Sequence, residues 1–119
     1  MMKKVIRFWT DPNQICYGKV KLDYVDSKAI NQFLNNDLQF SEVSCLEMLD
    51  RIDRIMDRVN QSYEMTGNCC TVILSNPNIS IINEYTNDVS ENLDIKDFRI
   101  IIEKWLEFIS TREPIEFSW

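Results

Sequence analysis

Alternating hydrophobic and polar residues predict strands near the start of the chain. Residues 17–25 alternate between apolar and charged side chains, the pattern of a sheet that is wet on one face. Residues 3–10 are rich in β-branched and aromatic side chains, which favour a strand. The segment 11–13 between them, Asp-Pro-Asn, is typical of a turn. We therefore expect two strands in the first 25 residues.

In the next two segments of the chain, apolar residues recur at the spacing of a helix. Residues 28–36 predict a short helix. A longer helix is expected over 42–64, with Ser41 or Ser44 as its N-cap and Gly67 closing it. Its apolar residues recur at helical spacing and are expected to face the core. These residues are Leu49, Ile52, Met56, Val59 and Tyr63.

The second half of the chain returns to strands and then ends with a helix. Residues 69–75 and 79–86 read as strands of a hairpin. Residues 95–110 carry a broad apolar face at helical spacing, and Asp94 is placed to cap that helix. Trp105 belongs to this face and is expected in the core.

Together these elements predict one α+β domain over residues 1–119. The order is strand, strand, helix, helix, strand, strand, helix, and an antiparallel sheet of about four strands is expected to pack against two or three helices. The tail, residues 115–119, is either a short fifth strand or an extension that docks back on the domain. Exposure of the terminal Trp119 would be unusual unless it docks or meets a partner.

The charge of the chain narrows the choice of partner. The formal net charge is −6. Residues 1–30 contribute six bases and three acids, a net of +3, and residues 31–119 contribute seven bases and sixteen acids, a net of −9. Because phosphate binding needs clustered Lys and Arg, we expect no direct binding of nucleic acid. A basic protein is the better partner, although surface acids also serve solubility alone.

The absence of histidine argues against an enzyme and a metal site. The chain contains no His, which removes the commonest general base and metal ligand. The four cysteines lack metal-binding spacing, and the adjacent Cys69 and Cys70 would point to opposite faces of a strand. We expect buried, reduced thiols, no catalytic residue and no cofactor.

The first candidate binding surface lies on the predicted long helix. Asp50, Asp53 and Asp57 follow one line on its surface, beside a parallel line of arginines. One interpretation is a solvated face stabilised by pairs of opposite charge. The other is an acidic line that binds Lys or Arg of a partner. The Asp53–Asp57 pair favours the second, because like charges four residues apart do not stabilise a helix.

The second candidate surface is the acidic stretch after the hairpin. Glu84, Asp88 and Glu91 lie on or near a predicted loop, where binding residues concentrate. Tyr85 lies among them and is suited to anchor a partner. The alternative is an ordinary polar connection rich in Asn, Asp and Ser.

The N-terminus predicts a cytoplasmic protein. Two lysines are followed by a short apolar run that Arg7 interrupts, which is not the pattern of a signal peptide. No stretch of the sequence approaches the length of a membrane span. We therefore expect no association with a membrane. The sequence makes no prediction of the oligomeric state.

In size, acidity and mixed α/β pattern, the chain resembles the bacterial immunity proteins of contact-dependent growth inhibition and other polymorphic toxin systems. The resemblance implies a protein that binds a cognate toxin domain, with a nuclease as the expected target because its active site is basic. Two alternatives remain open. One is an acidic inhibitor or adaptor that mimics nucleic acid, and the other is a small enzyme with a site that uses no histidine.

Overall fold

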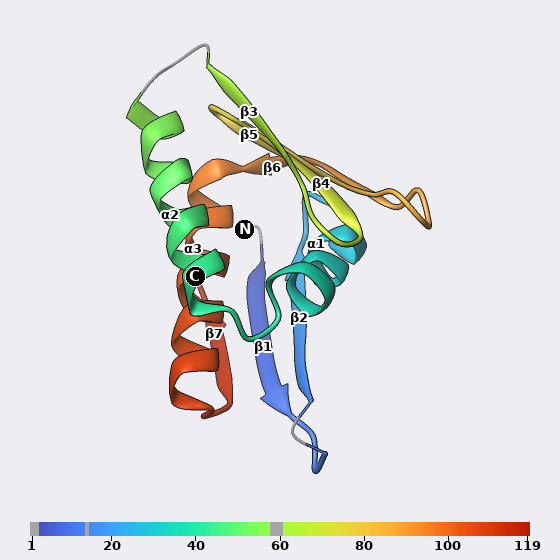
Figure 1. Ribbon diagram of the computed structural model, residues 1–119, viewed down its shortest axis with the longest axis vertical. Helices are drawn as coiled ribbons and strands as arrows, with labels where there is room; N and C mark the ends of the chain where they lie inside the picture. The colour runs from blue at the N-terminus through green and yellow to red at the C-terminus, as the bar shows by residue number, and fades with distance from the viewer. Residues whose placement is uncertain (1–2, 14, 58–60) are drawn as a thin grey trace.

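The α+β class is confirmed by the computed structural model, which describes residues 3–13, 15–57 and 61–119. Its strands form two antiparallel sheets rather than one (Figure 1). The first has the order β2-β1-β7, and the second has the order β3-β4-β5-β6. The strands are β1 (Lys4–Thr10), β2 (Cys16–Leu22), β3 (Ser62–Thr66), β4 (Cys70–Ser75), β5 (Asn78–Asn83), β6 (Val89–Asp94) and β7 (Ile115–Ser118).

The helices pack against the two sheets. They are α1 (Lys28–Phe33), which continues into a π-helical turn η1 (Leu34–Leu38), then α2 (Glu42–Asp57) and α3 (Ile95–Thr111). Helices α2 and α3 lie side by side, and α1 lies against β2 and β5 (Figure 1). The arrangement buries one face of each sheet and the inner faces of the helices in one core.

Helix α3 forms the centre of that core. Asp94 caps it as expected, because its carboxylate accepts the backbone N–H of Lys96 at 2.7 Å. Trp105 is fully buried, with its ring edge-on to Phe8 at a centroid distance of 4.9 Å. A Cβ on Gly18 would lie 2.7 Å from the Trp105 ring. The glycine therefore lets the first sheet approach the indole closely.

The predicted helix over 42–64 is wrong in its second part. Within the described residues α2 ends at Asp57, and residues 62–66 form strand β3. Val59 and Arg58 lie outside the described residues. Tyr63 lies on β3, opposite Leu74 of β4. Gly67 belongs to the β3–β4 turn and has no positive φ, so it closes no helix. Local helical spacing is overridden here by pairing with β4.

Two further strands, β6 and β7, complete the two sheets. Residues 89–94 form β6, where the sequence predicted a loop, and β6 pairs with β5 across a register shift between Ile79 and Ile81. The tail forms β7, the first of the two expectations, and pairs with β1. Trp119 docks back on the domain through a hydrogen bond from its Nε1 to Asp97 at 2.9 Å.

Candidate protein-binding surface on α2 and β3

Helix α2 buries one side and leaves apolar residues exposed on the other. Its buried residues are Cys45, Met48, Ile52 and Ile55. On the opposite side Val43 is 65% exposed and Leu46 is 56% exposed. Ser41 starts the helix by accepting the backbone N–H of Ser44 at 3.1 Å, which holds Val43 in the first turn. Exposed aliphatic residues with acids around them are typical of interaction surfaces.

The same outer side of α2 is acidic. Five acids and two arginines lie within the described helix, a net charge of −3, and all five acids are exposed. The acids are Glu42, Glu47, Asp50, Asp53 and Asp57. We define the outer α2 face as Val43 and Leu46 together with Asp50 and Asp57, which follow on the same side of the helix about one turn and about three turns beyond Leu46. It joins an apolar contact area to a negative rim, the arrangement expected for binding a basic protein.

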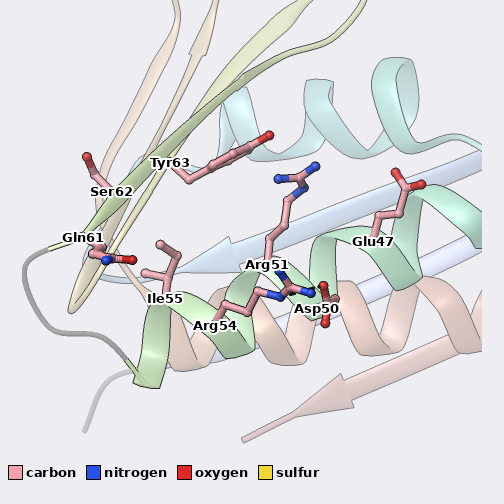
Figure 2. Close-up of a pocket in the computed structure, with 8 residues that line it drawn as sticks. All are labelled: Glu47, Asp50, Arg51, Arg54, Ile55, Gln61, Ser62 and Tyr63. Atoms are coloured by element: carbon pink, nitrogen blue, oxygen red, sulfur yellow. Dashed lines mark ion pairs between the residues drawn. The ribbon is translucent and has the colours of Figure 1, made fainter.

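A groove separates α2 from strand β3 (Figure 2). Its volume is about 510 Å³. The guanidinium of Arg51 lies over the ring of Tyr63 at 4.2 Å, and Arg54 pairs with Asp50 at 3.1 Å. Glu47 lines this groove and also a second cavity of about 150 Å³ near Met65. The groove and the cavity therefore follow the length of β3.

Strand β3 lies at the edge of the four-stranded sheet. The backbone N–H of Gly67 donates to the carbonyl of Cys70 at 2.9 Å. Because hydrogen-bonded pairs alternate along antiparallel strands, the backbone groups of Ser62, Glu64 and Thr66 point away from β4. Such an edge can accept an extended segment of another protein. Glu64 is exposed at its centre and favours a basic residue opposite it.

The predicted aspartates of α2 differ in what they contact. Asp53 is bound to Arg99 of α3, with Nε at 2.7 Å from Oδ1, and hydrogen bonds from this guanidinium lower the pKa of Asp53. Asp50 pairs with Arg54 within the helix, as its spacing predicted. Asp57 is exposed at the end of the described helix. Thus Asp53 joins two helices, whereas Asp50 and Asp57 lie on the outer α2 face.

The second predicted group lies around the turn between β5 and β6. Tyr85 is 79% exposed, and Glu84 and Glu91 are exposed as well. Asp88 instead accepts hydrogen bonds from Gln32 at 2.9 Å and Thr86 at 2.7 Å. These hydrogen bonds lower the pKa of Asp88. Asp88 therefore attaches the turn to the domain, and Tyr85 projects from it.

The structure does not bring the two predicted groups together. The β5–β6 turn projects at the right of Figure 1, whereas α2 lies at the left. The structure adds Val43 and Leu46 of α2 and the open edge of β3 to the candidate surface. A helical wheel of 42–57 would have placed both aliphatic residues opposite Met48 and Ile52, so that signal is present in the sequence. The edge of β3 was hidden by the helix prediction.

One group of potential metal ligands occurs among the described residues. It consists of Asp37, Cys69 and Cys70, and their ligand atoms lie within 4.8 Å of one another. None of the predicted partner-binding residues belongs to it. The described part of the chain also contains no helix whose length and apolar content would let it cross a membrane.

Comparison of the chain with protein-family models, with curated proteins and with solved structures gives no match.

Proposed function

We propose that the protein is a small acidic interaction protein of the bacterial cytoplasm. It binds a cognate toxin domain, a nuclease by preference, and neutralises it by covering the basic active site. The observation that carries the proposal is the outer α2 face, where Val43 and Leu46 are exposed on the same side of the helix as Asp50 and Asp57. The general resemblance of the sequence to immunity proteins supports the choice of a toxin as the partner.

Each part of this surface has a physical role in the proposed complex. The net charge of −6 attracts a basic partner and speeds encounter. Burial of Val43 and Leu46 removes apolar area from water and slows dissociation. The neighbouring edge of β3 offers backbone groups to an extended segment of the toxin. The acidic face then occupies the basic active site of the toxin, and it keeps the phosphates of the nucleic-acid substrate out of that site.

The test uses the toxin domain encoded next to this protein. The two are co-expressed, and growth, co-purification and association kinetics are measured. We expect protection of the cells and a stable complex whose association slows as ionic strength rises, because salt screens exposed charges. A protein that neither binds nor protects would refute the proposal. Capture of a DNA-binding protein that is not a toxin would refute it too, in favour of an acidic nucleic-acid mimic.

Matched charge reversals locate the contact. The double variant Asp50→Lys and Asp57→Lys changes the outer α2 face. The double variant Glu84→Lys and Glu91→Lys makes the same change in charge in the β5–β6 turn and in strand β6. We expect the first to weaken binding by about 10–100-fold, mainly by slower association, and the second to leave it nearly unchanged. The reverse result would move the contact to the turn around Tyr85.

A proline substitution tests the edge of β3 separately. Because the N–H of Glu64 points away from β4, Glu64→Pro removes a donor at the edge and leaves the β3–β4 hydrogen bonds in place. Loss of binding in this variant, with binding retained in Glu64→Thr, would indicate strand addition. Equal binding by both variants would exclude it and restrict the contact to α2.

A further inference from the structure

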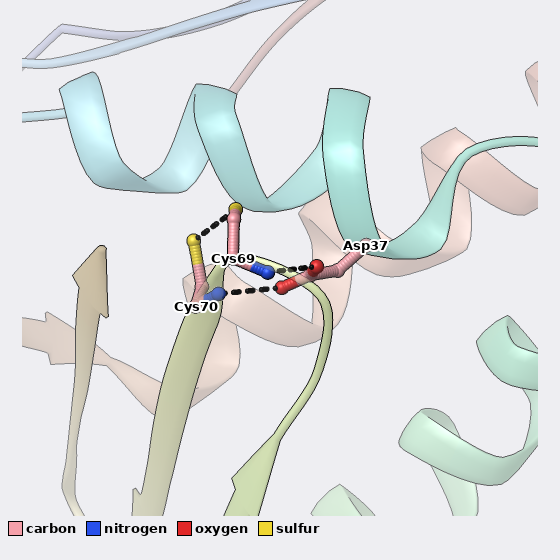
Figure 3. A group of neighbouring side chains, drawn as sticks. All are labelled: Asp37, Cys69 and Cys70. Carbon is pink, nitrogen blue, oxygen red and sulfur yellow. Dashed lines mark hydrogen bonds between the residues drawn. The ribbon is translucent and has the colours of Figure 1, made fainter. Parts of the chain in front are cut away.

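Two adjacent thiols lie side by side at the start of β4. Cys70 is the first residue of that strand and Cys69 precedes it, so the alternation that predicted opposite directions does not apply to this pair. Their Sγ atoms lie 2.9 Å apart, and both cysteines are free thiols (Figure 3). The sequence prediction that the two side chains point to opposite faces is therefore wrong. The thiols form a potential chelating pair.

A carboxylate holds the backbone of this pair in place. Asp37 of η1 accepts the N–H of Cys69 at 2.9 Å through Oδ1 and the N–H of Cys70 at 3.0 Å through Oδ2. A Cβ on Gly67 would lie 2.9 Å from Cγ of Asp37, so the β3–β4 turn closes against the carboxylate. Each carboxylate oxygen has a second lone pair, which leaves Asp37 able to act as a ligand.

An ion can reach this cluster from solvent. The cavity of about 150 Å³ is bordered by Asp37, Gly67 and Cys70. Cys70 is fully buried, whereas Cys69 is partly exposed. An entry path and room for water beside the ligands are two requirements of a metal site. The cluster thus combines fixed donors with access.

The donor atoms define the kind of ion. We propose that Cys69, Cys70 and Asp37 bind a thiophilic divalent cation, Zn²⁺ or its heavier analogue Cd²⁺. Two thiolates favour such ions over Mg²⁺ or Ca²⁺, and water completes a tetrahedral shell. On binding, two metal–sulfur bonds form and two protons leave the thiols, with no change in oxidation state. Zn–S bonds of about 2.3 Å place tetrahedral sulfurs roughly 3.8 Å apart, so the partly exposed Cys69 side chain rotates outward when the ion binds.

Proton competition gives the site a pH dependence. A thiol must lose its proton before its sulfur can bind the metal, so protons and metal compete for both cysteines. Because the metal binds thiolates, affinity falls as the pH falls. We expect tighter binding at pH 8 than at pH 6. This behaviour is independent of the proposed toxin binding, since none of the three ligands lies on the outer α2 face.

The experiment titrates the reduced, metal-free, full-length protein with Cd²⁺. We expect thiolate-to-metal absorbance in the ultraviolet that saturates at one ion per chain, and Zn²⁺ should compete with it. Cys69→Ser should reduce the absorbance change at saturation by about half and weaken Cd²⁺ binding at least tenfold. Cys16→Ser changes a thiol outside the cluster and should leave the absorbance change and the affinity as they are in the wild type. Circular dichroism checks that each variant is folded.

The result has clear alternatives. If Cys70→Ser fails to fold, Cys69→Ser decides, because its thiol is partly exposed. Asp37→Gln should weaken Cd²⁺ binding while two thiolates still contribute to the absorbance. Absence of thiolate absorbance at millimolar Cd²⁺ would overturn the proposal. The same would follow from absorbance that Cys69→Ser leaves unchanged.

Discussion

At the scale of single residues, Asp97 has the most contacts that the sequence did not indicate. It lies in the first turn of α3, where an acid favours the positive end of the helix. In the structure it is 4% exposed and accepts hydrogen bonds from Tyr24 Oη at 2.6 Å, Trp119 Nε1 at 2.9 Å and Lys4 Nζ at 3.2 Å. One carboxylate therefore connects α3 to β1, to the segment after β2 and to the chain end.

These contacts predict a pH-dependent stability. Burial raises the pKa of Asp97, but hydrogen bonds from Tyr24, Trp119 and Lys4 together outweigh it, and the net pKa is lowered. The folded pKa lies below the unfolded value of about 3.9, so the carboxylate stabilises the fold above pH 4 and loses this effect as the pH falls through the folded pKa. Asp97→Asn should cost about 2–4 kcal/mol at pH 7, because a buried charged pair is broken.

Urea unfolding from pH 7 down to pH 3 measures this difference. The gap in unfolding free energy between the wild type and Asp97→Asn should narrow below about pH 4. Glu91→Gln, a change at an exposed acid, should stay within about 0.5 kcal/mol of the wild type throughout. A gap that does not change with pH would show that Asp97 stabilises by shape rather than by charge.

At the scale of elements, α2 shows how one helix serves two surfaces. Its inner face packs on α3, and its outer face carries Val43 and Leu46 into solvent. The Asp53–Arg99 ion pair lies along the boundary with α3. Arg99 also pairs with Glu103 within α3, which orients its guanidinium. The line of aspartates thus divides between a helix–helix contact and the outer α2 face.

A double-mutant cycle on Asp53→Asn and Arg99→Gln should separate these roles. Both side chains are about a third to a half exposed, so we expect a coupling energy of about 0.2–1 kcal/mol that decreases in high salt. Chemical unfolding of the two single variants and the double variant measures it. A coupling near zero would mean that Asp53 is as available to a partner as Asp50.

Strand β3 shows the limit of local patterns at this scale. Tyr63 fits the helical spacing that begins at Leu49, and the same residue fits the alternation of β3 with Met65. The pairing with β4 selects the strand over the helix, because each residue of β3 pairs with a residue of β4. Helix and strand propensities differ by about 1 kcal/mol or less per residue, so tertiary pairing overrides them.

At the scale of the whole molecule, the two ends of the chain are held together. Strand β7 pairs with β1, and the N–H of Trp119 donates to the carbonyl of Lys4 at 3.2 Å. The tail also covers one edge of the first sheet and supplies a donor to Asp97. The tail, for which the sequence left open a short strand or a docked extension, is therefore a strand of the folded domain.

Removal of residues 115–119 should destabilise the protein more than Asp97→Asn does. The deletion removes strand β7, which leaves the edge of β1 exposed, and it also removes the hydrogen bond from Trp119 to the buried carboxylate of Asp97. The two losses of stability add. Thermal unfolding compares the deletion with Trp119→Phe, which keeps the strand and loses the indole donor. A deletion no less stable than Trp119→Phe would show that β7 adds nothing beyond that donor.

The sequence by itself determined the class of this protein and most of its elements. β-Branched and aromatic residues predicted β1, alternation predicted β2, and apolar spacing with Asp94 predicted α3. These signals survive because each lies within a few neighbouring residues. The two acidic groups could be listed from composition and spacing. Their separation on the molecule became visible with the packing of the elements, whereas the outward position of Val43 and Leu46 is already present in the helical spacing of the sequence.

Tertiary structure alone decided the division into two sheets, the formation of strand β3 in place of a helix over residues 62–66, and the assembly of Asp37 with Cys69 and Cys70. The first sheet and the Asp37 cluster bring together residues more than twenty positions apart, and strand β3 forms because β4 is present to pair with it. A local sequence pattern reports only the conformational preference of its own turn or strand. Pairing and burial between distant segments depend on the sequence of the whole chain.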